Sequence, residues 1–146
     1  MKTLRLMAIV AVAILVAGCC ACRKNRNTVP LVGTEWKLSQ LGNEPVVGDN
    51  YRMTLAEDGR ISGIGDCNRF TGSFIRRAGG TRTSGELTMA ENLVSTRMMC
   101  LNQARETAFM KVLREADSWS IDGNRLLLIR DGDVLAIFDQ TPVTAY

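Results

Sequence analysis

Cysteine is the residue type in this chain with the widest choice of chemistry. The sequence has 146 residues, with five cysteines and no histidine. Without histidine the chain lacks the commonest general base, the usual catalytic triads and most kinds of zinc site. Cys67 and Cys100 are far apart and do not have the Cys-x-x-Cys spacing of thiol oxidoreductases. We expect these two residues to form a disulfide, and two separate buried thiols are the alternative.

The other three cysteines, Cys19, Cys20 and Cys22, lie near the start of the chain. Residues 6–16 form an apolar run behind two basic residues, and the sequence Val-Ala-Gly-Cys ending at Cys19 follows. This layout is typical of a secretory signal. Its last four residues are similar to the bacterial lipobox, whose cysteine is lipidated and becomes the mature N-terminus. A plain signal peptide is one alternative, and an uncleaved anchor is another, although spanning a bilayer takes about 20 apolar residues.

This signal divides the chain into three parts. We expect residues 1–18 to be a lipoprotein signal peptide, residues 19–30 a lipidated basic tether and residues 31–140 one folded domain. Cys20 follows Cys19 at the position where lipoproteins retained in the inner membrane often have aspartate. The predicted location is therefore the cell envelope, on the outer membrane facing the periplasm, where disulfides form.

The elements that must position the polar and sulfur-containing side chains are mostly short strands. Alternating apolar and polar residues predict them between turns rich in Gly, Asp and Asn. The expected strands are 34–41, 51–55, 60–64, 70–76, 85–89, 118–121, 125–130 and 134–138. Asn102 is the expected N-cap of one helix, whose apolar stripe is Ala104, Ala108, Phe109, Val112, Leu113 and Ala116. The predicted fold class is α+β: mainly antiparallel β-sheet or a partly closed barrel of about eight short strands, packed on one α-helix.

Two segments combine side chains that could bind a ligand. The first has the sequence Gly-Asp-Cys-Asn-Arg-Phe around Asn68 and Arg69, and the second has Ser-Thr-Arg-Met-Met-Cys around Thr96 and Arg97. Glycine permits bulges and close chain crossings, and asparagine bonds to the backbone of turns. We therefore favour a scaffold role for these segments. A ligand site built from the four polar side chains is the alternative.

Metal binding is not predicted. The methionines at 98, 99 and 110 are interpreted as core filler rather than as a metal-binding set. A zinc site would have to combine Cys67 and Cys100 with two cysteines on a flexible tether, which is sterically unfavourable. We expect no metal and no cofactor.

The spaced motifs resemble the META-domain family, which includes the heat-shock lipoprotein HslJ. Its pattern has a Gly-Thr-x-Trp opening, found here at 33–36, and a Gly-Cys-Asn-x-Phe-x-Gly core, found at 66–72 with Asp66 in place of the first glycine. A Ser-Thr-x-Met-x-Cys turn follows at 95–100. The resemblance covers about residues 31–138. It implies an α+β fold dominated by antiparallel sheet, and an envelope protein linked to heat-shock and antibiotic tolerance without an established reaction.

These patterns favour binding over catalysis. No pair of carboxylates has a recognisable acid–base arrangement, and no phosphate-binding loop is present. Basic residues are scattered, so no nucleic-acid partner is expected. We predict a monomeric, non-enzymatic, membrane-anchored lipoprotein with a META/HslJ-like domain that binds an envelope protein or a lipid in envelope stress tolerance. The alternative function is a lipid-binding or pilotin-like chaperone of outer-membrane components.

Overall fold

A closed antiparallel β-barrel is the main feature of the computed structural model, which describes residues 28–48 and 50–141. The strands are β1 (Glu35–Leu41), β2 (Glu44–Pro45), β3 (Tyr51–Leu55), β4 (Arg60–Gly65), β5 (Asn68–Arg76), β6 (Ser84–Met89), β7 (Val94–Ser95), β8 (Ser118–Asp122), β9 (Arg125–Arg130) and β10 (Asp133–Gln140). The described part also has one helix, α2 (Gln103–Glu115). The expected signal peptide, Cys19 and most of the tether lie outside the described residues.

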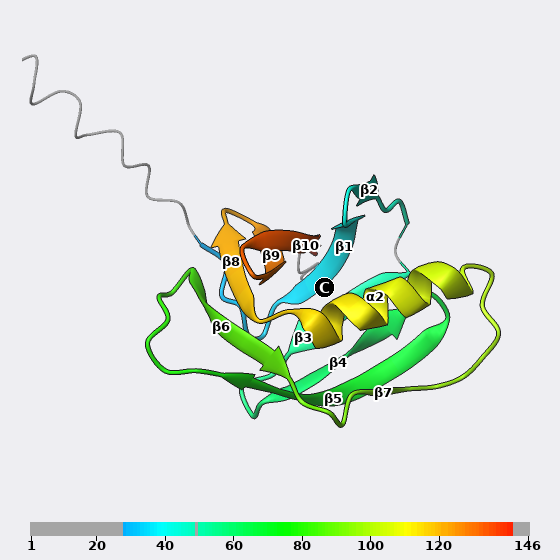
Figure 1. Cartoon of the computed structure of the whole chain (residues 1–146), viewed down its shortest axis with the longest axis horizontal. Coiled ribbons are helices and arrows are strands. Elements are labelled where there is room, and N and C mark those ends of the chain that lie inside the picture. The colour runs from blue at the N-terminus through cyan, green and yellow to red at the C-terminus, as the bar shows by residue number, and fades with distance from the viewer. Residues whose placement is uncertain (1–27, 49, 142–146) are drawn as a thin grey trace, which may run out of the picture.

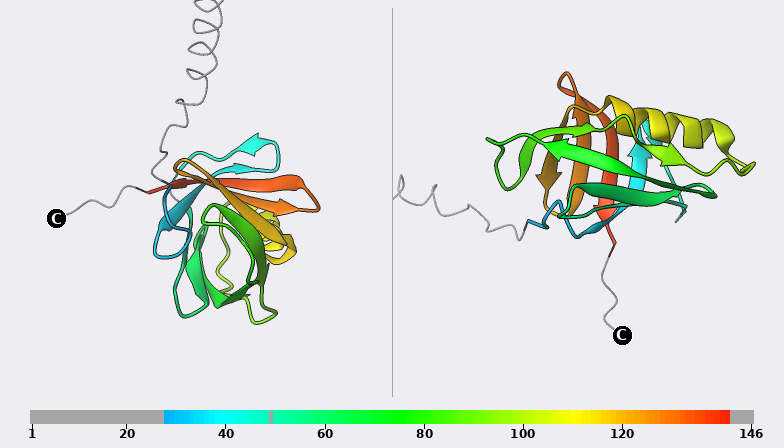
Figure 2. Two further views of the ribbon diagram at one scale, coloured as in Figure 1. Left: turned by 90° about the vertical axis from the view of Figure 1, so that its left-hand side faces the viewer. Right: turned by 90° about the horizontal axis from the view of Figure 1, so that it is seen from below.

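Eight of the strands form the barrel in the order β1-β3-β4-β5-β6-β8-β9-β10, and β10 pairs back with β1 (Figures 1 and 2). The short strand β2 pairs with Gln40 and Leu41 at the end of β1, and β7 pairs with Phe70 and Thr71 of β5. The predicted α+β class, with about eight antiparallel strands and one helix, is confirmed, and the barrel is fully closed. Among the described residues no helix is both long and apolar enough to cross a membrane.

The barrel interior is filled by large side chains. Trp36, Phe109 and Phe138 are completely buried. The Phe109 ring of α2 lies 5.4 Å from the Tyr51 ring and 5.7 Å from the Phe70 ring, in edge-on contacts. Because its aromatic neighbours come from β3, β5 and β10, Phe109 packs the helix against three different strands of the barrel. The buried hydrophobic residues of the described part lie between Leu31 and Phe138, so this domain contains its own core.

The helix is rotated relative to the predicted stripe. Ala104 and Ala108 are exposed, and the buried face contains Glu106, Phe109 and Leu113. Alanine contributes little burial energy, so the large aromatic and aliphatic side chains determine which face turns inward. Glu106, which is not part of the predicted apolar stripe, is therefore buried.

Two predictions about methionines were wrong. Met110 is buried, but Met98 is 55% exposed and Met99 is 89% exposed, so neither fills the core. Asn102 is the N-cap residue of α2, as predicted, although its side chain makes no capping bond. Instead its backbone N–H donates to Asp66 Oδ2 at 3.1 Å. A carboxylate from the β4–β5 turn thus replaces a local cap at the positive end of the helix.

Candidate functional site

Asn68, the first residue of β5, is the centre of a buried hydrogen-bond network. Only 3% of this residue is exposed. Its Oδ1 accepts from the Thr96 hydroxyl and from the Met98 N–H, each at 2.8 Å. Its Nδ2 donates to the Met98 carbonyl oxygen at 3.1 Å and to Glu106 Oε2 at 2.8 Å. One side chain therefore holds the segment before α2, and α2 itself, against the barrel.

A disulfide joins the same two regions beside this network. It links Cys67, immediately before β5, to Cys100, three residues before the start of α2, with the two Cα atoms 5.7 Å apart. Asn68 Nδ2 also lies 3.2 Å from Cys100 Sγ. The covalent bond and the amide network thus restrain one short segment together, which explains how its backbone is fixed although Met98 and Met99 extend into solvent.

The four polar residues predicted as a possible ligand site do not face one hollow. Asn68 and Thr96 are in contact inside the network, and the Arg69 N–H donates to Thr96 Oγ1 at 3.1 Å. Asn68, Thr96 and Arg97 line one hollow beside α2, whereas the Arg69 side chain lies on the outer face of β5 in a second hollow that Thr96 also borders. Asn68 therefore supports the surface from beneath, and Arg69 belongs to the surface itself.

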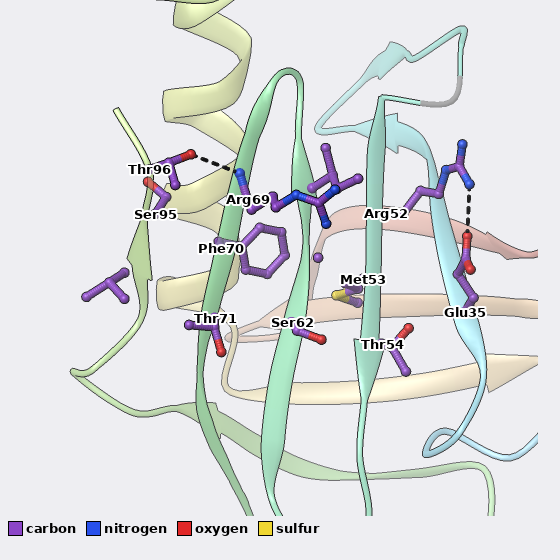
Figure 3. Close-up of a pocket in the computed structure, with 13 residues that line it drawn as sticks. Glu35, Arg52, Met53, Thr54, Ser62, Arg69, Phe70, Thr71, Ser95 and Thr96 are labelled. Atoms are coloured by element: carbon purple, nitrogen blue, oxygen red, sulfur yellow. Dashed lines mark hydrogen bonds and ion pairs between the residues drawn. The ribbon is translucent and has the colours of Figure 1, made fainter. Parts of the chain in front are cut away.

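The hollow that contains Arg69 is a groove of about 650 Å³ on the outside of the barrel, which we call the outer groove (Figure 3). It crosses β3, β4, β5 and β7. Its lining residues are Glu35, Arg52, Met53, Thr54, Ser62, Gly63, Ile64, Arg69, Phe70, Thr71, Val94, Ser95 and Thr96. Its size is in the range of small-molecule sites.

Strand register arranges the groove in two rows. Arg52, Ile64 and Arg69 are paired across β3, β4 and β5. Two residues farther along each strand, Thr54, Ser62 and Thr71 are paired in the same way. Because alternate residues of a strand share a face, both rows point outward while Met53 and Phe70 point into the core. The first row has two guanidinium groups and the second has three hydroxyls.

Gly63 allows the floor of the groove to close tightly. A Cβ atom at this position would overlap the backbone oxygen of Arg52 and lie 2.5 Å from the Phe70 ring. The ring of Phe70 therefore packs directly against the β4 backbone, where a side chain would otherwise be. This contact gives the groove a rigid floor.

Charge on the groove is mostly positive. Arg52 Nη1 lies 3.2 Å from Glu35 Oε1, the one carboxylate in the lining. Lys37 is paired directly opposite Arg52 but does not line the groove. Arg69 forms no ion pair or side-chain hydrogen bond with any residue that the structure describes.

Tyr51 has a buried hydroxyl close to the Asn68 network. This hydroxyl has no hydrogen-bond partner among the described residues. Burial raises the pKa of Tyr51 above its ordinary value of 10.0, and the carboxylates of Asp66 and Glu106 raise it further against the opposing charge of Arg105. The residue acts as a core side chain with an unsatisfied polar end, and it does not face the outer groove.

No metal-binding cluster is present in residues 28–48 and 50–141. No three His, Cys, Asp or Glu side chains in these ranges are grouped to hold a metal ion. Sequence reasoning missed Arg52, Thr54, Ser62 and Ile64 as groove residues. Alternation along each strand could place them outward, but only the register between strands shows that they are neighbours.

Comparisons with known proteins agree with this architecture. A family model described as META domain matches residues 29–142. An NMR structure of a protein from Burkholderia xenovorans is 24% identical, with a TM-score of 0.57, covering 76% of this chain and 83% of that one. A second NMR structure is 26% identical, with a TM-score of 0.59 and coverage of 79% and 95%. A DUF4847 family protein from Bacteroides vulgatus shares the fold at 15% identity, with a TM-score of 0.55 and coverage of 75% and 93%. No curated protein matches the chain.

Proposed function

Since the chain belongs to the META-domain family, we propose that it is a non-enzymatic binding protein of the bacterial cell envelope. In this proposal a lipidated Cys19 anchors it to the outer membrane, and the domain contributes to envelope stress tolerance by binding a ligand in the outer groove. The observation that carries the proposal is the groove itself, a rigid hollow with outward hydroxyls and an unpaired guanidinium at Arg69 within the described part.

The composition of the groove supports binding rather than catalysis. Its one carboxylate, Glu35, is engaged by Arg52 at 3.2 Å. General acid–base catalysis needs a positioned proton donor and acceptor, and the lining offers hydroxyls and guanidinium groups instead. Such groups orient and hold a polar ligand.

The filled barrel weighs against the alternative of a lipid carrier or pilotin-like chaperone with an interior cavity. Trp36, Phe109 and Phe138 occupy the volume that an acyl chain would need. Native mass spectrometry of the protein purified from its host tests this alternative. A lipid that is bound in a fixed ratio would favour the carrier over the groove.

Anchoring is tested with the Cys19→Ser variant of the full chain. Metabolic labelling with a palmitate analogue and membrane fractionation should show a labelled, membrane-bound wild-type protein. The variant should be unlabelled and released from the membrane fraction, because without Cys19 it has no acyl chains to anchor it. A wild-type protein without label would contradict the lipoprotein part of the proposal.

Binding through the groove is tested in living cells with a photoreactive amino acid at Ser62. The matched control carries the same amino acid at Thr88, an exposed position of β6 outside the groove. Specific adducts should form from position 62 and not from position 88, and should increase during heat stress. Equal labelling from both positions would contradict a binding role for the groove. Failure of a deletion strain to show any heat or envelope-stress defect would contradict the role in stress tolerance.

A further inference from the structure

We propose that Met98 and Met99 form a reversible oxidation site, at which hypochlorous acid converts the two thioethers to sulfoxides while the domain stays folded. The two residues lie between β7 and α2, on a segment that runs along the outside of the molecule (Figure 1). This inference goes beyond the proposed binding function and does not rest on it.

The first argument is access. Met98 is 55% exposed and Met99 is 89% exposed. The other methionines of the described part are Met53, Met89 and Met110, and each is at most 6% exposed. Oxidation of methionine requires that the oxidant reach the sulfur atom, and a buried sulfur is reached only when the structure around it opens at a cost in free energy. The two exposed thioethers should therefore be oxidised first.

The second argument is the state of the other sulfur atoms. Cysteine thiolates compete with thioethers for an oxidant. The two cysteines of the described part, Cys67 and Cys100, are joined in a disulfide and so have no thiolate. In residues 28–48 and 50–141 the reduced sulfur atoms that an oxidant can reach from solvent are therefore those of Met98 and Met99.

The third argument is that the backbone of the segment does not depend on the two side chains. The Met98 N–H donates to Asn68 Oδ1 at 2.8 Å, and the Met98 carbonyl oxygen accepts from Asn68 Nδ2 at 3.1 Å. The disulfide fixes the chain again at Cys100, one residue after Met99. A sulfoxide is polar, so it disrupts a core but is tolerated where the side chain is in water. The segment should therefore keep its conformation after oxidation.

The oxidised side chains also have hydrogen-bond donors nearby. Arg97 and Arg114 line the same hollow beside α2 as the two methionines. Thioether sulfur is a weak acceptor, whereas the oxygen of a sulfoxide is polar and can accept from a guanidinium group or from water. This hollow therefore suits the product of the oxidation as well as the reduced side chains.

The reaction needs only hypochlorous acid and water. A sulfur lone pair attacks the chlorine atom and forms a sulfur–chlorine bond, and hydroxide leaves. Water then adds its oxygen to sulfur, the sulfur–chlorine bond breaks, and chloride leaves. In total one thioether and one hypochlorous acid give one sulfoxide, one chloride and one proton, so sulfur is oxidised and chlorine is reduced. A methionine sulfoxide reductase reverses the change with two thiols, which become a disulfide while the oxygen leaves as water.

Peptide mapping by mass spectrometry tests the site. Residues 28–146, which contain the whole described core, are treated with limiting hypochlorous acid. Met98 and Met99 should gain oxygen at least about tenfold faster than the three buried methionines, which are internal controls in the same molecule. A methionine sulfoxide reductase supplied with dithiothreitol should then remove the added oxygen.

Urea unfolding with matched variants tests whether the domain stays folded. The oxidised wild type should have the same unfolding midpoint as the untreated protein. The double variant Met98→Leu with Met99→Leu keeps two apolar side chains of similar size, and its midpoint should not change on treatment. Met89→Leu, which replaces a buried methionine of β6, should gain oxygen at positions 98 and 99 as the wild type does.

Three results would overturn the inference. These are oxygen spread evenly over the five methionines of the described part, a midpoint that falls on oxidation of the wild type but not of the double variant, and sulfoxides that the reductase does not remove. None of these results affects the proposed binding function, which is tested separately by the adducts formed from position 62.

Discussion

Replacing Asn68 by aspartate exchanges one NH₂ group for an oxygen at the centre of the buried network. In the native protein that NH₂ group donates to Glu106 Oε2 at 2.8 Å and to the Met98 carbonyl oxygen at 3.1 Å. In Asn68→Asp the donor is lost, and two carboxylates face each other at a site where both residues are less than a tenth exposed. The variant keeps the volume and shape of the side chain, so its effect reports charge and hydrogen bonding.

The expected destabilisation is large. Two like charges about 4 Å apart repel by about 4 kcal/mol at an effective dielectric constant of 20, and each lost hydrogen bond adds about 1 kcal/mol. Uptake of a proton by the pair limits the total, so we expect a loss of about 3–5 kcal/mol at pH 7 from a stability that is typically 5–15 kcal/mol. The loss should be smaller at pH 4, where a shared proton removes the repulsion.

A reversed pair provides the matched control. Combining Asn68→Asp with Glu106→Gln restores one donor opposite one acceptor, so the double variant should recover about 2 kcal/mol relative to the single variant. Glu106→Gln alone should cost little, because its amide oxygen can still accept from Asn68. Urea unfolding, followed by the fluorescence of the buried Trp36 and Trp119, measures the stability of all four proteins. A single variant within about 1 kcal/mol of the wild type, or a double variant no more stable than the single one, would refute the network.

Four other substitutions have defined outcomes in the same unfolding assay. Replacing Cys67 and Cys100 together by serine should remove about 3–4 kcal/mol, because the disulfide closes a loop with a sequence separation of 33; an unchanged midpoint would show that it does not restrain the unfolded chain. Gly63→Ala should cost about 2–3 kcal/mol through overlap with a strand oxygen and an aromatic ring, and a neutral effect would contradict the tight floor. Asp66 has a φ of 55°, so Asp66→Ala should be about 1 kcal/mol less stable than Asp66→Gly, and equal values would argue against backbone strain. Tyr51→Phe should gain about 1 kcal/mol at pH 7. In the wild type the raised pKa of Tyr51 makes stability decline as pH rises above 10.0, and a variant that declines equally there would exclude this residue as the cause.

Local patterns predicted most of the barrel strands. In β3 the buried residues Tyr51, Met53 and Leu55 alternate with Arg52 and Thr54, so the periodicity of two is visible without any partner strand. Strands β2 and β7 have two residues each and cannot produce such a pattern. Their existence depends on pairing with β1 and β5.

Closure and register could not be predicted from local patterns. The pairing of β1 with β10 brings Trp36 opposite Gln140, and no local feature marks these residues as partners. The prediction of which face of α2 is buried was wrong for a related reason. Glu106 is buried because Asn68 supplies a hydrogen bond from a strand distant in sequence, and burial of a carboxylate depends on such a partner.

The motif residues could be recognised in the sequence and the groove residues could not, and this difference has a physical cause. Asn68, Cys67 and Cys100 each need a fixed partner, so their types and order are constrained by the fold and form a pattern that sequence reasoning can find. Arg69 and Ser62 point away from the barrel, where many side chains would satisfy the same strand. The motif therefore identifies the scaffold that holds the groove in shape. Under the proposed binding function, the ligand is selected by outward residues that the motif does not include. It follows that two proteins with this fold and this motif can bind different ligands, and that the groove residues must be examined in each of them.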